Sequence, residues 1–228
     1  MDRMRDNPKS LTATAYGLLR QDIMWGRLPP DSHIKIDHIS ETYNIGLTPI
    51  REALSRLSAE GLVVSEINRG FRTPPATIED LHDIVAHRKL IECETLKVAV
   101  DNGDEDWEAR VIAAYHLMTR VEERGLAKGS NPWEEWEDRH REFHEALISG
   151  ANSNWSIKIL RLLYDQSDRY RRLYRSDTFI VPGIQGDHKE ILDAVLARDG
   201  KAAVRSMALH LERLNDGAAR SDYFETPA

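Results

Sequence analysis

Residues 47–61 read LTPIREALSRLSAEG, and they carry the start, the buried face and the end of one short helix. Thr48 is a good N-cap, and Pro49 suits the first helical position, where a missing N–H costs nothing. Gly61 is placed to end the helix in the left-handed conformation. Apolar residues recur at steps of three and four, which predicts one buried face: Ile50, Ala53, Leu54 and Leu57.

The outer face of this helix is basic and hydroxyl-bearing, with Arg51, Ser55 and Arg56. A helix of this kind suits the major groove of DNA. Most such helices simply have a solvated face, so this composition alone does not distinguish a DNA-reading helix from an ordinary surface helix. The flanking residues do.

Two helices are predicted before this one, at residues 11–26 and 36–43, with a compact turn that ends at Gly46. Helices joined by a short glycine-containing turn are typical of a helix-turn-helix. After it, β-prone runs at residues 62–65 and 71–73 flank a polar, glycine-containing tip, which predicts a hairpin. This part of the chain is therefore predicted to be a winged helix-turn-helix, with residues 47–61 as its recognition helix.

Pro74-Pro75 breaks regular structure, and we place a domain boundary there. We expect a DNA-binding domain at residues 1–75 and a second domain at residues 76–228. The second domain has helical periodicity throughout, which predicts an all-α six-helix bundle and a mainly α fold class. The predicted helices are residues 77–101, 104–126, 132–149, 153–176, 184–199 and 200–217.

The composition is that of an ordinary globular protein: 228 residues, 41% hydrophobic and 30% charged. The single cysteine, Cys93, rules out an internal disulfide and fits a reducing compartment. There is no run of about 18 apolar residues, and the N-terminus lacks the apolar core of a signal peptide. These features predict a cytoplasmic protein without a membrane segment.

The net charge of −7 is unevenly distributed along the chain. Residues 1–75 hold ten Lys/Arg and nine Asp/Glu, a balance of +1, so the acidic excess lies after residue 75. A near-neutral domain still binds phosphates if its cations share one face. The negative total and the absence of basic tails argue against a structural DNA-compacting protein.

Four of the nine histidines adjoin the apolar faces of three predicted helices: His140, His144, His188 and His210. His140 and His144 are four residues apart, so their rings project from one face, a common way to present two ligands to a metal. Such a pair alone is more often a surface or core feature. Four buried imidazoles are costly unless something satisfies them, and a divalent metal inside the bundle does so for all four.

Arg88, Tyr170 and Arg171 are predicted to face the interior of the second domain. Arg88 lies in phase with apolar residues of its helix, and a buried arginine needs an anion. That anion is either Glu92, four residues along, or the carboxylate of a ligand, and the sequence leaves both open. Tyr170 and Arg171 continue the apolar phase of their helix, whereas its other cations are expected in solvent: Arg169, Arg172 and Arg175.

The chain resembles GntR-family bacterial transcription regulators of the FadR subfamily, with an FCD-type effector domain. The matching segments are residues 47–57, Glu60-Gly61-Leu62-Val63, Arg69-Gly70-Phe71, Arg88 with Glu92, His140 with Phe143-His144, residues 188–195, and Met207 with His210-Leu211. They span nearly the whole chain in the expected order. Residues 102–109 and 136–144 look closest to the CsiR-type regulators, which respond to glutarate.

The resemblance implies a homodimeric regulator, most simply a repressor, that binds a palindromic double-stranded DNA operator. Together with the geometry of the predicted elements, it indicates these DNA contacts: Lys35, Thr48, Pro49, Arg51, Arg56, Arg69 and Gly70. Many family members carry arginine where this chain has Leu47. One usual DNA contact is therefore missing, and the operator sequence is not transferable.

In the FCD family an aspartate and three histidines commonly hold a divalent ion, and His140 occupies the aspartate position here. An all-imidazole set shifts the preference toward Zn or Ni. By resemblance the metal, Arg88, Tyr170 and Arg171 would bind a small carboxylate effector of the glutarate type. The alternative is a metal-dependent enzyme of small carboxylates with a DNA-binding head. Because Glu145 lies on a different helical face from His144, there is no evident partner base, and we predict no catalytic residues.

We expect Arg51→Ala to abolish specific operator binding while leaving the fold intact, because the first residues of a recognition helix enter the groove first. The other interpretation of Arg51 is a surface salt bridge with Glu52 or Glu60. A gel-shift assay at physiological salt separates the two, since full affinity of the variant would contradict the DNA-reading role.

Overall fold

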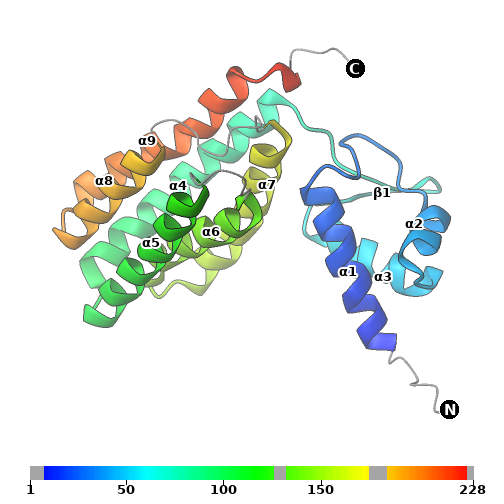
Figure 1. Cartoon of the computed structure of the whole chain (residues 1–228), viewed down its shortest axis with the longest axis horizontal. Helices are drawn as coiled ribbons and strands as arrows, with labels where there is room; N and C mark the ends of the chain where they lie inside the picture. The colour runs from blue at the N-terminus through cyan, green and yellow to red at the C-terminus, as the bar shows by residue number, and fades with distance from the viewer. Residues whose placement is uncertain (1–7, 126–131, 175–183, 225–228) are drawn as a thin grey trace. The chain divides into compact units, whose positions relative to one another are not determined.

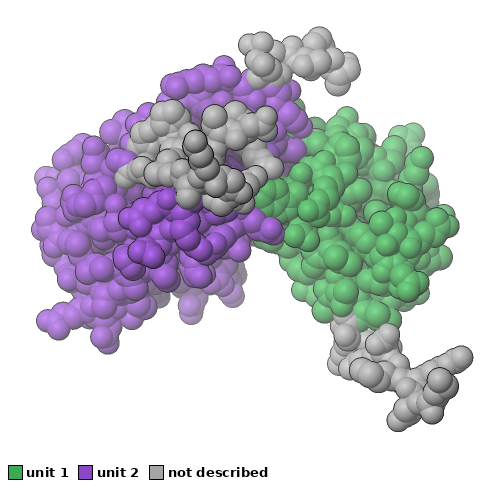
Figure 2. Space-filling view, in the orientation of Figure 1, with its two compact units in different colours: residues 1–77 green, residues 78–228 purple. Residues whose placement is uncertain are grey.

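The structure is a computed structural model that describes residues 8–125, 132–174 and 184–224. The chain divides into two compact units, residues 1–77 and residues 78–228 (Figures 1 and 2). Each unit has its own helices and its own buried interior, and each is described separately below.

The first unit is a winged helix-turn-helix. Its three helices are α1 (Pro8–Met24), α2 (Ile36–Tyr43) and α3 (Leu47–Ala59), followed by strands β1 (Val64–Glu66) and β2 (Gly70–Arg72) (Figure 1). The strands are antiparallel, with Ser65 opposite Phe71, and His33 adds an isolated bridge to Arg72. The predicted recognition helix is α3, and the predicted hairpin is the wing.

The boundaries of α3 differ slightly from the prediction. The helix begins at Leu47, and Gly46, in an extended conformation, occupies the N-cap position. Thr48 is therefore not the N-cap but lies inside the first turn, because the helical backbone starts two residues earlier than its side-chain chemistry suggests. At the other end Gly61 has a φ of 72°, the left-handed conformation that was predicted.

The predicted apolar face of α3 forms the centre of the first unit. Ile50, Ala53, Leu54 and Leu57 are all fully buried. They pack in one cluster with residues of α1 that follow the same three- and four-residue spacing: Ala15, Leu19 and Ile23. Burying a side chain of this size contributes about 1.5–3 kcal/mol, so this face holds α3 against α1 and leaves its outer face exposed.

The second unit is an all-helical bundle, as predicted. In the described residues its helices are α4 (Ile78–Asn102), α5 (Glu105–Gly125), α6 (Trp133–Ser149), α7 (Asn154–Tyr174), α8 (Ile184–Leu196) and α9 (Gly200–Ala219), with a 3-10 turn η1 (Asp222–Phe224). The long helix α4 packs against α9, α7 and α6, and α5 packs against α6 and α8 (Figure 1). Among the described residues, no helix is both long and apolar enough to cross a membrane.

The buried indole of Trp107 closes one end of this bundle. Its Nε1 donates to the carbonyl oxygen of Ala146 at 2.9 Å, which ties α5 to α6. Gly103 and Gly150 flank the ring so closely that a Cβ at Gly103 would lie 2.1 Å from a ring carbon of Trp107. This junction therefore requires glycine for space rather than for backbone freedom.

We expect Gly103→Ala to lower the free energy of unfolding of the second unit by about 3 kcal/mol, because overpacking a rigid buried ring forces the helices apart. The matched control is Gly186→Ala in α8, where an added Cβ meets no atom within 4 Å. That change should stabilise the helix by about 0.5–1 kcal/mol. Urea unfolding followed by tryptophan fluorescence measures both, and equal stability of the two variants would contradict the packing argument.

Candidate metal centre and nucleic-acid interface

The four predicted histidines meet inside the second unit. His140 and His144 come from α6, His188 from α8 and His210 from α9. One ring nitrogen of each lies within 4.8 Å of the corresponding atom of every other. All four side chains are buried, with at most 5% of any residue exposed. Residues that are 70 positions apart in the chain thus present their donor atoms to one small volume.

His144 and His210 point their ring nitrogens at each other. Their Nε2 atoms lie 3.1 Å apart, and on the far side of the His144 ring Nδ1 lies 2.6 Å from Oε1 of Glu92. A proton on Nδ1 donates to that carboxylate and leaves Nε2 of His144 with a free lone pair. A carboxylate behind a histidine in this way fixes the tautomer that a metal needs.

His140 and His188 have no such hydrogen bonds. Within the described residues, Nε2 of His140 and both ring nitrogens of His188 are buried without a hydrogen-bond partner, and so is Nδ1 of His210. A buried polar atom without a partner costs about 1–3 kcal/mol. Nδ1 of His210 lies 3.9 Å from Oδ2 of Asp187. The unpartnered nitrogens of His140 and His188, beside the facing Nε2 atoms of His144 and His210, are the pattern expected when the missing partner is a cation that accepts nitrogen lone pairs, so these residues fit a divalent metal.

The protonation state of the cluster agrees with this fit. Burial is the main cause that lowers the pKa of all four histidines, to about 4 for His210 and well below the ordinary value for His140 and His188. The guanidinium of Arg171 and the neighbouring imidazoles lower the pKa of His140 further. The rings are therefore neutral near pH 7, and their lone pairs are available to a metal.

Glu92 lies against the histidine cluster, whereas the sequence indicated it only as a partner for Arg88. Its carboxylate accepts hydrogen bonds from His144, from the Tyr164 hydroxyl at 3.0 Å, and from Nε and Nη2 of Arg88 at 3.1 and 2.9 Å. Burial alone would raise the pKa of Glu92, but Arg88 and His144 lower it to about 2. Only the i, i+4 spacing from Arg88 signalled Glu92 in the sequence. Tyr164 is in the inward apolar phase of its helix, but no local signal pairs it with Glu92.

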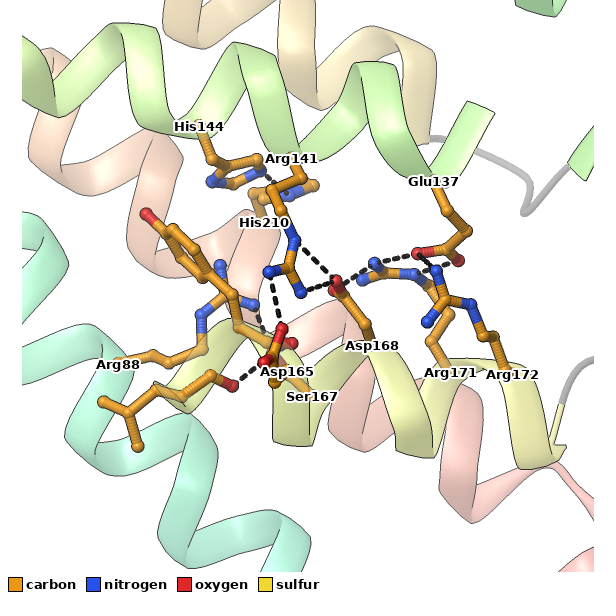
Figure 3. Close-up of polar contacts among 12 residues, drawn as sticks. Arg88, Glu137, Arg141, His144, Asp165, Ser167, Asp168, Arg171, Arg172 and His210 are labelled. Atoms are coloured by element: carbon orange, nitrogen blue, oxygen red, sulfur yellow. Dashed lines mark hydrogen bonds and ion pairs between the residues drawn. The ribbon is translucent and has the colours of Figure 1, made fainter. Parts of the chain in front are cut away.

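The residues predicted to bind an effector are all buried and all have protein partners; Figure 3 shows Arg88 and Arg171 among theirs. Arg88 realises the Glu92 pair that the sequence left open, and its Nη1 donates to Ser167 at 3.0 Å. Arg171 donates to Glu137 at 2.8 and 2.6 Å and to Asp168 at 2.6 Å. Tyr170 donates to Asp80, in the first turn of α4, at 2.7 Å.

The ion network around Arg171 joins α6 to α7. Arg141, one residue after His140, pairs with Asp165 at 2.5 Å and with Asp168 (Figure 3). Trp136 stacks on His140 with ring centroids 4.6 Å apart, and the Arg171 guanidinium lies 5.7 Å from the Trp136 ring centroid. The histidines of α6 are therefore held in place by charges from the neighbouring helix.

One detail of the predicted α7 surface is wrong. Arg169 was expected in solvent but is only 2% exposed, because it lies against the ring of Tyr170, with its guanidinium carbon 5.4 Å from the ring centroid. Arg172 is also largely covered, with 9% of its side chain exposed. Arg175 lies outside the described residues.

The predicted DNA contacts lie on the surface of the first unit. Lys35, Thr48, Arg51 and Arg69 are exposed, and Pro49 and Gly70 are partly exposed. Arg56 is exposed but stacks on Tyr16 of α1, with its guanidinium carbon 4.4 Å from the ring centroid. The start of α3 and the tip of the wing thus offer cations and a hydroxyl on one unit, and Arg56 lies toward α1.

The carboxylates proposed as alternative partners of Arg51 are engaged by α1. Glu52 accepts a hydrogen bond from Thr12 and Glu60 accepts one from Tyr16, both at 2.8 Å. The structure shows no ion pair of Arg51 with any described residue. Its guanidinium is therefore left for an outside acceptor.

The wing is a tight hairpin with ion pairs at its base. Asn68 and Gly70 adopt positive φ values of 60° and 88°, which give the tight tip that carries Arg69. At its base Arg72 pairs with Asp31 at 3.0 Å and with Glu66 at 3.4 Å. The exposed cation at the tip is therefore held on an anchored hairpin.

Two family descriptions match the chain. Residues 11–72 match "Bacterial regulatory proteins, gntR family", and residues 83–213 match the FCD domain.

Curated relatives align along most of the chain. It is 37% identical over 206 residues to the protein named "Uncharacterized HTH-type transcriptional regulator BphR" from Paraburkholderia xenovorans (strain LB400), which covers 90% of this chain and 84% of that protein. It is 32% identical over 200 residues to the "HTH-type transcriptional repressor GlaR" of Escherichia coli (strain K12), which covers 86% and 90%.

Solved structures share the fold. A GntR regulator from Rhodococcus sp. RHA1 superposes with a TM-score of 0.73 at 24% identity, over 91% of this chain and 97% of that one. The E. coli protein McbR/YncC superposes with a TM-score of 0.71 at 20% identity, over 90% and 94%.

We expect Asp168→Asn to lower the free energy of unfolding by about 3 kcal/mol at pH 7, because it leaves Arg141 and Arg171 buried with one carboxylate fewer. Despite burial, Arg171 and Arg141 hold the pKa of Asp168 below its ordinary value. Its contribution is therefore complete above the unfolded pKa of about 4 and is lost as the pH falls below it, so the difference from wild type should shrink on acidification.

Urea unfolding followed by near-ultraviolet circular dichroism measures this effect. The matched control is Asp193→Asn, which breaks the exposed i, i+4 pair with Lys189 and should change the stability by less than about 1 kcal/mol. An Asp168→Asn loss no greater than that of the control would show that the buried network does not hold the helices.

Proposed function

We propose the following function for a chain that belongs to the GntR family of bacterial regulatory proteins and carries an FCD domain. The chain is a transcription regulator with a DNA-binding head and an effector-binding domain, and its relatives are named as regulators rather than enzymes. We infer that it acts as a repressor in the cytoplasm, at operators on bacterial DNA. Relatives named as repressors support this sign of regulation.

We propose that the histidine cluster holds one divalent metal through His140, His144, His188 and His210. The observation that carries this is the convergence of four buried, neutral imidazoles, each with one ring nitrogen within 4.8 Å of the others, of which His140 and His188 have ring nitrogens without a hydrogen-bond partner among the described residues. Zn or Ni is favoured because all four donors are imidazoles and none is a carboxylate. When bound, the ion supplies a fixed positive charge to which an anionic ligand can bind.

The proposed effector is a small carboxylate of the glutarate type. Arg88 and Arg171 are the proposed partners of the effector carboxylate. Arg88 is linked to the histidine cluster through Glu92, and Arg171 lowers the pKa of His140. Both already pair with protein carboxylates, so an incoming carboxylate would have to rearrange those pairs. Exchange of the protein carboxylate for the effector carboxylate would act as the switch, because it would move α4 or α7 without creating a net buried charge.

We also propose a homodimer that reads a palindromic operator. Helix-turn-helix heads of this size gain affinity and specificity by binding two half-sites about one helical turn apart. Effector binding in the second unit would act by changing how the two heads are presented to the DNA. Lys35, Thr48, Pro49, Arg51, Arg56, Arg69 and Gly70 are the proposed contacts, with Thr48 and Arg51 at the reading edge.

We expect full-length protein purified without chelator to contain about one divalent ion per chain. Removing the ion should lower the melting temperature, because a ligand that binds only the folded state at 100 times its Kd contributes about 2.7 kcal/mol. Small dicarboxylates should raise the melting temperature of the metal-loaded protein but not of the chelated protein. A dicarboxylate that does so should also change a gel-shift with operator DNA.

The informative variant is His188→Ala, since His188 makes no hydrogen bond with the described residues and loses only its packing and the metal. It should lose the ion and the response to chelator. The matched control is His116→Ala, because His116 is an exposed histidine of α5 outside the cluster. Wild-type protein that takes up no ion on metal loading, or a His188→Ala variant that keeps a full complement, would refute the metal centre.

A further inference from the structure

The first unit exposes few large apolar side chains, and their positions are unusual. In the described residues of this unit they are Leu47 at 45%, Val64 at 40% and Ile67 at 90% exposure. Leu47 is the first residue of the recognition helix α3, and Val64 and Ile67 lie on the wing hairpin. The exposed apolar surface of this unit is therefore confined to the two elements that contact DNA in a winged helix.

Leu47 has no packing role that explains it. The partly buried apolar residues that border the core of this unit do not include it, in the part of the chain that the structure describes. It follows Gly46, whose extended backbone carries the chain into α3. With 45% of its surface exposed and no place among the residues that border the core, Leu47 leaves apolar surface for a partner outside the chain.

The orientation of α3 places Leu47 beside the reading edge. Leu47 and Arg51 are four residues apart and project from the same side of the helix. The opposite edge of α3 is turned toward α1, where Glu52 accepts a hydrogen bond from Thr12 and Arg56 stacks on Tyr16. A groove that receives Arg51 therefore receives Leu47 as well, at the end of the helix that enters first.

The chemistry of the major groove leaves one partner for such a side chain. The base edges present hydrogen-bond donors and acceptors, and the C5-methyl group of thymine is the apolar feature among them. Leucine has no group that can bind a guanine edge or a phosphate. A polar base edge opposite Leu47 would lose its water without a replacement, whereas a thymine methyl gains from losing water.

We propose that Leu47 is a specificity-determining residue that selects a thymine in each half-site by contact with its C5-methyl group. The proposal rests on the proposed DNA-binding function and adds the identity of one base that the head reads. Leu47 would recognise its base by shape and hydrophobic contact, whereas Arg51 would contact the DNA through its charge.

The test starts from a duplex selected by the full-length protein from a library of random sequence. Each thymine of that duplex is then replaced by deoxyuridine, which removes only the methyl group. At one position per half-site we expect the affinity of the wild-type protein to fall about fourfold, the factor for burying one methyl-sized group. Leu47→Ala should bind the thymine and deoxyuridine duplexes equally, and Ile67→Ala, the matched control on the wing, should keep the wild-type difference.

A second variant should change which base is preferred, rather than only weaken the preference for thymine. Leu47→Arg should shift the selected base at this position from thymine toward guanine, whose O6 and N7 an arginine reads, and should steepen the salt dependence of binding. Deoxyuridine effects absent at every position, or equal in wild type and Leu47→Ala, would overturn the proposal. A library that yields no enriched sequence would instead count against operator binding itself, so the two failures are distinguishable.

Discussion

The interior of the second unit depends on one buried carboxylate. Glu92, on α4, is fully buried and binds Arg88 of its own helix, His144 of α6 and Tyr164 of α7. An ionised carboxylate in that environment is tolerated only while its partners are present, because an unpaired buried charge costs several kcal/mol. The three helices therefore have to assemble together around Glu92, and the ring orientation of His144 follows from that assembly.

The charges around the histidines are balanced before any cation arrives. Arg88 pairs with Glu92, Arg171 pairs with Glu137, and Arg171 and Arg141 share Asp168. The imidazoles are neutral. A divalent ion, as proposed, would add two positive charges to an interior in which Glu92, Glu137 and Asp168 already pair with arginines. An anion that enters with the ion restores the balance, which is the physical reason to connect a metal with a carboxylate effector in this domain.

Much of the fold could be predicted from the sequence. The helices of the second unit lie within three residues of their predicted ends, because helical periodicity and breaks such as Asn102-Gly103 are local signals. The approach of the four histidines was also predictable, since each adjoined an apolar face. The pairing of Arg171 with Glu137, 34 residues away, and the burial of Arg169 were not predictable. The local sequence does not show whether a charged residue of a helix faces solvent or a buried partner far away in the chain. The start of α3 at Leu47 was missed for a related reason: backbone geometry at Gly46 replaced the side-chain cap that Thr48 suggested.

The bracing of α3 by α1 separates the part of the recognition helix that builds the fold from the part that meets DNA. One face is buried in the core, one edge is tied to α1 through Glu52, Arg56 and Glu60, and the exposed remainder includes Leu47, Thr48, Arg51 and Ser55, of which the first three are proposed to meet DNA. Substitutions among these exposed residues change little in the interior. Such a head can diverge in operator preference during evolution, or be reprogrammed by grafting a few side chains, while the effector domain keeps its own chemistry.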